Sequence, residues 1–223
     1  MRARYVPTAE LETLRDPEAT GWKQVGSEDL KLEGTPLGMQ LTAHIRAAWS
    51  ERKIGSVERV SVAAVHDGRS LAIRLEWDAA KESREPVDND QFPDAAAVML
   101  PSTPDSPIFT MGAPGQAVNV WYWRADDERA RDVVAEGLGT SRTVDVELVK
   151  ARGTWKEGRW RVVIARALRV DTSEPVAQLE PGASTGFGVA VWDGSRGERA
   201  GIKAFSGPLW QELQLDAMPT ARR

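Results

Sequence analysis

The sequence contains no cysteine among its 223 residues. This absence excludes a disulfide framework, a cysteine-ligated zinc site, an iron–sulfur cluster, a thiol nucleophile and a covalently attached haem. Cysteine-free chains occur in reducing and oxidising compartments alike, so the count leaves the location open. There are only two histidines, and neither has carboxylates at the spacing of a zinc or catalytic motif. We therefore name no catalytic residue.

Long apolar runs and clusters of basic residues are also missing. No window reaches the ~18 consecutive apolar residues of a membrane span. Lysine and arginine are scattered through a chain of formal net charge −4, which argues against nucleic acid as a partner. The opening residues 1–22 lack the apolar core of a Sec-type signal peptide, so we expect no such signal in this sequence.

The composition that is present describes an ordinary globular protein. Hydrophobic residues make up 41% of the chain, which is too apolar for disorder. Nine tryptophans allow a large core without covalent cross-links, because burying one indole removes ~150–250 Å² from water. We expect one domain over residues 38–216, preceded by an extended N-terminal arm at 1–37 and followed by a C-terminal tail at 217–223.

Alternation of apolar and polar residues predicts antiparallel strands. One pair is expected over residues 57–77, with Asp67 and Gly68 in its hairpin turn. A second pair is expected over residues 144–168 and turns at 155–160. Hairpins at this spacing predict an all-β fold, an antiparallel Greek-key-like β-sandwich with one or two short helices.

Three further assignments follow from the same local patterns. The charged residues of the second hairpin, Glu147, Arg161 and Arg166, are expected on its solvated face. A short helix is expected over residues 9–15. A clearer helix is expected over 126–137, which has an acidic first turn, apolar residues on one side and a terminal glycine.

Three isolated polar residues are candidates for chemistry. His66 precedes a hairpin turn, where a side chain is normally solvated, so we expect it at the surface. His44 has more apolar neighbours, where a lone histidine is more often structural, and ligation of a metal is the alternative. Asp94 follows a proline at the start of a strand, where an aspartate is more often a turn or capping group than a functional carboxylate.

The densest aromatic strand is expected at residues 118–123. Alternation places Trp121 and Trp123 on one face with Asn119, and Tyr122 on the other. The two indoles are large enough to form core, to line a cofactor pocket or to stack on a sugar. Composition alone favours the core.

Two apolar, glycine-flanked runs each contain a side chain able to ligate a metal. Met111 lies in the run at 108–112, and the adjacent glycine is expected to let a flat ligand approach the backbone. Lys203 lies in the run at 201–210. In an extended chain it points the same way as Phe205, while Ile202 and Ala204 point the other way. By composition, a buried methionine is more often a core residue that fills a gap.

Four blocks carry a resemblance to a known family. They are FPDAAAVMLP at 92–101, IFTMG at 108–112, VNVWYWRAD at 118–126 and GIKAFSGPLWQEL at 201–213. In consistent order they resemble the haem b subunit of type II dimethyl sulfoxide reductase family molybdoenzymes. That family includes ethylbenzene dehydrogenase, dimethyl sulfide dehydrogenase, chlorate reductase and selenate reductase.

The resemblance implies a β-sandwich that binds one non-covalent b-type haem. By position, Met111 and Lys203 match the axial ligands, and Trp121, Trp123 and Phe205 are the expected pocket residues. The implied partners are a molybdenum-cofactor catalytic subunit, an iron–sulfur subunit and a soluble cytochrome c-type protein. The implied location is the periplasm, reached either after removal of a signal or by export together with a partner that carries one.

The resemblance also gives Lys203 a chemical requirement. An amine must lose its proton before it can bind iron, and burial disfavours the ammonium, so we expect its pKa to be lowered.

The alternative function is a carbohydrate-binding β-sandwich module in which Trp121 and Trp123 form the stacking platform.

Overall fold

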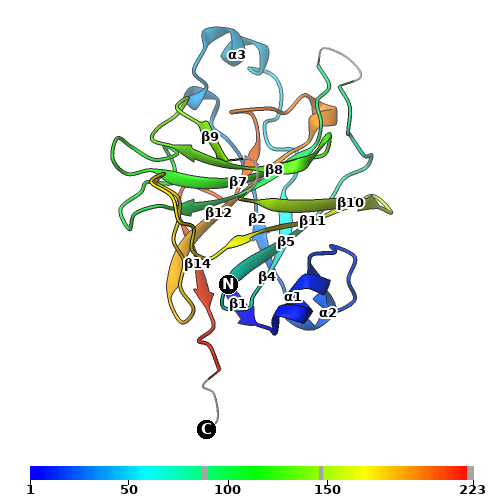
Figure 1. Cartoon of the computed structure of the whole chain (residues 1–223). Coiled ribbons are helices and arrows are strands. Elements are labelled where there is room, and N and C mark those ends of the chain that lie inside the picture. Colours follow the sequence, from blue (N-terminus) through cyan, green and yellow to red (C-terminus); the bar gives the residue numbers. More distant parts are fainter. Residues whose placement is uncertain (87–89, 146–147, 220–223) are drawn as a thin grey trace.

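The computed structural model describes residues 1–86, 90–145 and 148–219. Two β-sheets lie face to face and share the long strand β12 (Ser184–Trp192) (Figure 1). Residues 184–187 of β12 pair with the first sheet, and residues 188–192 pair with the second. This confirms the predicted all-β sandwich.

The first sheet has a mixed order that brings the two ends of the chain to its centre. From one edge it runs β10 (Lys150–Lys156), β11 (Arg159–Ala167), β5 (Ser70–Asp78), β4 (Arg59–His66), β1 (Arg2–Tyr5), β14 (Gln211–Leu215) and β12. Strand β2 (Glu28–Lys31) pairs with residues 59–62 of β4, and β1 pairs with residues 64–66 of the same strand.

The second sheet continues from β12 with antiparallel neighbours. Its order is β12, β6 (Ala95–Pro101), β7 (Val118–Arg124), β8 (Asp127–Ala135) and β9 (Arg142–Asp145). On the opposite edge of β12 lie β13 (Ala204–Phe205) and then β3 (Glu33–Gly34).

Alternate residues of both sheets fill the space between them. The inward set includes Val60, Val62, Ile73, Leu75, Val98, Trp121, Trp123, Val162, Ile164 and Val189. The predicted first hairpin is confirmed, because β4 and β5 pair directly on either side of the Asp67 turn. The Asp67 carboxylate accepts hydrogen bonds from the backbone N–H groups of Arg69 (2.9 Å) and Ser70 (2.8 Å).

The helix predicted over 126–137 is wrong, because these residues form β8. The local cap signals were present, but β7 offers a cross-strand partner from Tyr122 to Val118, and pairing with it determines the structure. Ala130, Asp132 and Val134 are buried on the inner side, in the period-two pattern of a strand.

The second hairpin is confirmed at its turn but not in its first strand. Trp155 pairs with Trp160 across the turn, and the first strand is β10, which begins at Lys150 rather than Val144. Glu147 lies outside the described residues. Arg166 was predicted to face solvent and is instead fully buried. Its even number places it with Val162 and Ile164, on the inner face of β11.

The arm predicted for residues 1–37 contributes to the sheet, where β1 is parallel to both β14 and β4. Helix α1 (Thr8–Leu14) matches the predicted short helix, and with α2 (Trp22–Val25) it covers the outer face of the first sheet. The domain boundaries remain predictions.

His66, expected at the surface, is fully buried at the end of β4, beside Tyr5 of β1.

The remaining helical segments are short. They are η1 (Leu37–Met39), α3 (Ala43–Ala48) and η2 (Gly194–Arg196). Within the described residues, none of the helices has the length and apolar character needed to cross a bilayer.

Candidate functional site

A cavity of about 470 Å³ lies on the outer face of the second sheet. Its floor is made of small or apolar residues on neighbouring strands: Ala97 and Met99 of β6, Val120 of β7, and Gly188 and Ala190 of β12. Small side chains at Ala97 and Ala190 leave the volume that larger ones would fill, while a Cβ at Gly188 would lie 2.6 Å from the Ile108 side chain. A cavity of this size and apolar character is typical of a cofactor site.

Met111 reaches the cavity from the loop between β6 and β7. Its N–H donates to the Ile108 carbonyl (3.0 Å), and its carbonyl accepts from the Gly137 N–H (2.9 Å). These bonds hold Met111 at φ 57°, a left-handed conformation that costs a non-glycine residue about 1–2 kcal/mol. Such conformations gather at functional sites, where the surrounding structure enforces them.

The role expected of Gly112 is different from the one found. A Cβ there would lie 2.5 Å from the Ala135 carbonyl oxygen, so the glycine lets the Met111 loop pack against the backbone of β8. Gly112 therefore positions Met111, and the prediction that it admits a flat ligand is wrong.

Lys203 lies just before β13 and also lines the cavity. Its carbonyl accepts a hydrogen bond from the Thr35 N–H (3.0 Å), and Ala204 turns into the core between the sheets. Lys203 and Phe205 line the same cavity, which confirms the predicted alternation.

The amine of Lys203 is buried without a polar partner. The side chain is 9% exposed, and burial lowers its pKa from 10.5 to about 8, in the direction expected. In the part of the chain that the structure describes, Nζ makes no hydrogen bond or ion pair, and it lies 5.6 Å from the centre of the Trp192 ring. An isolated buried ammonium is unfavourable, so the site is suited to a neutral amine.

Trp121 and Trp123 do not line this cavity. They are 0% and 2% exposed and lie in the core between the sheets, where Trp123 contacts Trp160 with ring centres 5.1 Å apart. Their predicted role as pocket residues is therefore wrong. The opposite face of β7 supplies Val120 and Tyr122, which sequence reasoning missed.

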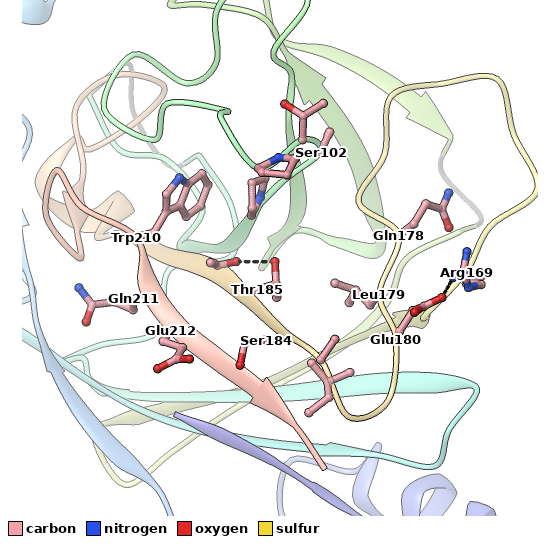
Figure 2. Close-up of a pocket in the computed structure, with 16 residues that line it drawn as sticks. Ser102, Arg169, Gln178, Leu179, Glu180, Ser184, Thr185, Trp210, Gln211 and Glu212 are labelled. Atoms are coloured by element: carbon pink, nitrogen blue, oxygen red, sulfur yellow. Dashed lines mark hydrogen bonds and ion pairs between the residues drawn. The ribbon is translucent and has the colours of Figure 1, made fainter. Parts of the chain in front are cut away.

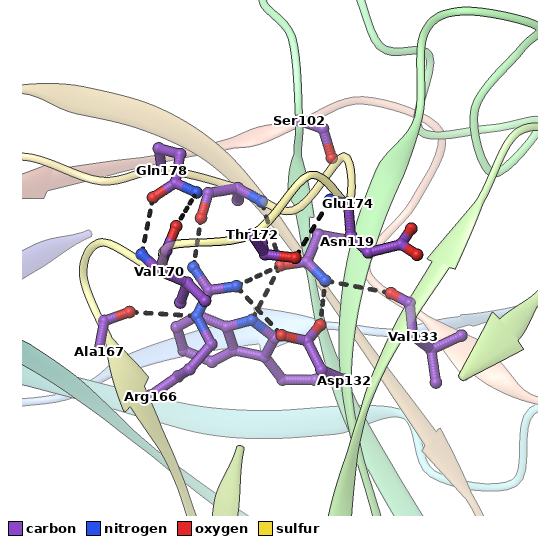
Figure 3. A network of polar contacts seen from close by, with 12 residues as sticks. Ser102, Asn119, Asp132, Val133, Arg166, Ala167, Val170, Thr172, Glu174 and Gln178 are labelled. Atoms are coloured by element: carbon purple, nitrogen blue, oxygen red, sulfur yellow. Dashed lines mark hydrogen bonds and ion pairs between the residues drawn. The ribbon is translucent and has the colours of Figure 1, made fainter. Parts of the chain in front are cut away.

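A buried polar network closes the inner side of the same wall (Figure 3). Arg166 of β11 donates to the Asn119 side-chain oxygen (2.8 Å) and to the Asp132 carboxylate (3.2 Å). Asn119 also donates to the Val133 carbonyl (3.1 Å), and the Trp121 N–H donates to Asn119 (3.1 Å). Since Val133 itself lines the cavity, this network fixes the strands β7 and β8 that form the cavity wall.

The other two candidates, Asp94 and His44, lie outside the cavity. Asp94 is buried and accepts from the Trp160 indole (2.8 Å) and from the N–H groups of Ser83 (3.0 Å) and Gly194 (2.9 Å). Burial raises its pKa to about 6. Asp94 thus ties together three segments, as a turn or capping residue does. His44 is exposed on α3 and does not line the cavity.

A second, more open hollow of about 790 Å³ lies beside the first half of β12 (Figure 2). Figure 2 shows Ser184 and Thr185 at its base, Trp210 on one side, and Gln178 and Glu180 on the other. It contains none of the residues predicted for a site.

The apolar cavity meets the chemical requirements of a haem. It offers a soft thioether, an amine whose pKa is already lowered, and an apolar lining for a porphyrin. Among the described residues, no cluster of three or more His, Asp or Glu could hold a bare metal ion.

A family model described as ethylbenzene dehydrogenase matches residues 19–147 and 140–204. The chain belongs to the ethylbenzene dehydrogenase family. This confirms the resemblance to haem subunits of type II dimethyl sulfoxide reductase family molybdoenzymes.

Three relatives agree with membership of the ethylbenzene dehydrogenase family. The chain is 33% identical to chlorate reductase subunit gamma of Ideonella dechloratans, over 87% of this chain and 77% of that one. It is 30% identical to a candidate respiratory nitrate reductase heme subunit of Haloferax mediterranei, over 86% and 66%. It is 24% identical to dimethylsulfide dehydrogenase subunit gamma of Rhodovulum sulfidophilum, over 94% and 79%.

Among solved structures, this family member is similar in fold to a family 9 carbohydrate-binding module from Caldicellulosiruptor kristjanssonii in complex with glucose. The TM-score is 0.54 at 11% identity, covering 100% of this chain and 98% of the other. At that identity the likeness concerns the sandwich architecture alone.

Proposed function

We propose that this chain is the electron-transfer subunit of a molybdenum-dependent oxidoreductase and binds one b-type haem non-covalently, with Met111 and Lys203 as axial ligands. The observation that carries the proposal is that one apolar cavity holds a strained methionine and a buried lysine without a polar partner among the described residues. Neither feature helps the fold. Each is accounted for if the fold holds a ligand there.

A bound haem with two protein ligands would supply a one-electron carrier with no open position for substrate. Met111 offers a soft sulfur donor, which favours the reduced metal. Lys203 offers a lone pair once its proton has left, and burial makes that loss easier. The apolar floor of Ala97, Val120 and Ala190 excludes water and disfavours net charge.

We further propose that the chain works in the periplasm with a molybdenum-cofactor subunit, an iron–sulfur subunit and a soluble cytochrome c-type partner. The subunit names of the relatives support assembly into a complex. Cell fractionation and purification from the source organism test both points. Partners should copurify at equal stoichiometry. A chain that purifies alone and turns over a substrate with an artificial acceptor would contradict a relay role.

The cofactor is tested by a Soret band on the purified chain. Acid–organic extraction should release unmodified protohaem, because no cysteine is present to hold it. Lys203→Ala and Met111→Ala should each open one coordination position and bind added imidazole, with a change in the ferric spectrum. The matched controls are Lys81→Ala and Met218→Ala, at exposed positions.

Each result has a definite meaning for the ligand assignment. If Lys203→Ala keeps the wild-type low-spin spectrum and ignores imidazole, Lys203 is not an axial ligand. If the chromophore stays with the chain after extraction, the haem is not of the b type.

A carbohydrate-binding role has lost its structural support. Stacking on a sugar needs an exposed indole face, and Trp121 and Trp123 are enclosed between the sheets. A colourless protein that binds oligosaccharide would nevertheless reverse this choice.

A further inference from the structure

The lining of the apolar cavity is not uniform. Polar and cationic side chains gather where β8 and β9 form its wall, at Arg131, Ser141, Arg142 and Thr143. The wall formed by β6, β12 and the Met111 loop is mainly apolar, with Ala97, Met99, Ile108 and Phe109 among its residues. A ligand with an apolar body and an acidic edge would bind this cavity in one orientation.

Tyr122 and Arg131 are direct cross-strand neighbours in the pairing of β7 with β8. Both side chains line the cavity. The Tyr122 ring is held edge-on by Trp192, with ring centres 5.5 Å apart. Within the described residues the Tyr122 hydroxyl makes no hydrogen bond. A half-buried phenol that lines a cavity without a partner among the described residues has a donor to offer a ligand.

Arg131 also keeps donors without a partner in the part of the chain that the structure describes. Its guanidinium bonds to the Asp127 carboxylate (3.2 Å), and a guanidinium carries five N–H donors in a fixed fork. Burial raises the pKa of Tyr122, so the phenol stays protonated and able to donate. A phenol and a guanidinium side by side on one wall match the needs of a carboxylate.

We propose that Tyr122 and Arg131 together bind a carboxylate at the edge of the cavity ligand, which is a porphyrin propionate if the proposed function holds. The inference rests on that function for the identity of the ligand. The paired hydroxyl and guanidinium carry the acid recognition. They turn the acidic edge of the porphyrin towards β8 and β9, and its apolar edge towards β6 and β12.

The test compares porphyrins with and without free acids. Cofactor-free full-length chain is titrated with metal-free protoporphyrin IX and with its dimethyl ester, and quenching of tryptophan fluorescence gives Kd. Tyr122→Phe and Arg131→Gln should each weaken binding of the free acid about 10-fold or more. Binding of the ester should change little. Metal-free porphyrins keep the axial ligands out of the comparison.

The chain offers two matched controls. Tyr5→Phe changes the only other tyrosine, which lies on β1 in the first sheet. Arg129→Gln changes a more exposed arginine on β8, two residues from Arg131, that does not line the cavity. Neither should affect the Kd of the acid or of the ester.

The outcomes separate the two proposals. If both variants weaken acid and ester equally, or weaken neither, the carboxylate assignment is overturned while the haem proposal stands. If neither porphyrin binds the wild-type chain, the proposed function fails and this inference fails with it. A selective loss of acid binding in both variants supports the inference.

Discussion

Two buried cations of this protein have opposite surroundings. Arg166, between the sheets, donates to Asn119, Asp132 and two backbone carbonyls, and lies over the ring of Trp121. Lys203, in the cavity on the outer face, makes no hydrogen bond or ion pair through its amine among the described residues, and the amine lies 5.6 Å from the centre of the Trp192 ring. Arg166 has hydrogen-bond partners within the chain and therefore has a structural role. Lys203 lacks such partners among the described residues, and its position is explained if a bound ligand interacts with its amine.

The largest effect is expected at Arg166. Replacing it with methionine removes a charged partner of the buried Asp132 carboxylate, so Arg166→Met should lower the free energy of unfolding by about 3–5 kcal/mol in urea titrations. Arg161→Met, on the same strand with ion pairs near the surface, should cost less than about 1 kcal/mol. Equal losses at the two positions would mean that burial of the pair does not matter.

The next effect is a gain in stability at Lys203. In the cofactor-free chain, Lys203→Met should be the more stable protein at pH 7, because the wild type buries an ammonium. Between pH 8 and pH 10.5 the unfolded state holds a proton that the folded state has released, so wild-type stability rises with pH.

The difference in unfolding free energy between wild type and Lys203→Met should therefore shrink by about 3 kcal/mol from pH 7 to pH 10.5. Urea titrations at the two pH values measure it. Lys81→Met, at an exposed lysine, should show no such pH dependence. A difference that stays constant with pH would show that the Lys203 amine is solvated in the folded chain.

A smaller effect is expected at the strained loop residue. Met111→Gly should be more stable than Met111→Ala by about 1 kcal/mol, because only glycine adopts φ 57° without penalty. Both variants lose the thioether, so the comparison isolates the backbone. Thermal unfolding of the cofactor-free proteins measures it. An alanine variant as stable as the glycine variant would show that the loop relaxes.

The smallest effect concerns the buried His66. Burial lowers its pKa, so the folded chain resists the proton that the unfolded chain accepts below pH ~6.5, and stability should fall slightly as pH drops through that range. His44→Gln, at the exposed histidine, should leave this acid dependence unchanged, whereas His66→Gln should reduce it. Unfolding titrations between pH 5 and pH 7 compare the variants.

Alternation along the strands predicted much of the fold, including the β4 and β5 hairpin and the two faces of β7. It could not say which face of β7 was core, because both faces of the second sheet are buried, one by the first sheet and one at the cavity. Composition alone favoured the core for Trp121, which is where it lies, and the pocket role implied by the family resemblance was the error. Tyr122, on the opposite face of β7, lines the cavity and was not predicted as a site residue.

Other errors arose where a distant partner determines the local structure. Residues 127–135 carry helix-like end signals and form a strand because β7 lies alongside. Arg166 was predicted to face solvent because it is charged. It lies two residues from Ile164 on the same strand, however, so both side chains face inward. The pairing of Met111 with Lys203 came from resemblance to a family. No local pattern predicts that two such distant runs share one cavity.

The position of β1 between β14 and β4 has a consequence for how the protein folds. Arg2 pairs with Gln214 and Ala3 pairs with Ala64, so the centre of this sheet joins strands that are far apart in the sequence. Closing it is a high-contact-order event, which is expected to be slow. Until β1 is in place, the backbone groups of β4 and β14 that it pairs with are unpaired, and such strand edges are prone to pair with other chains.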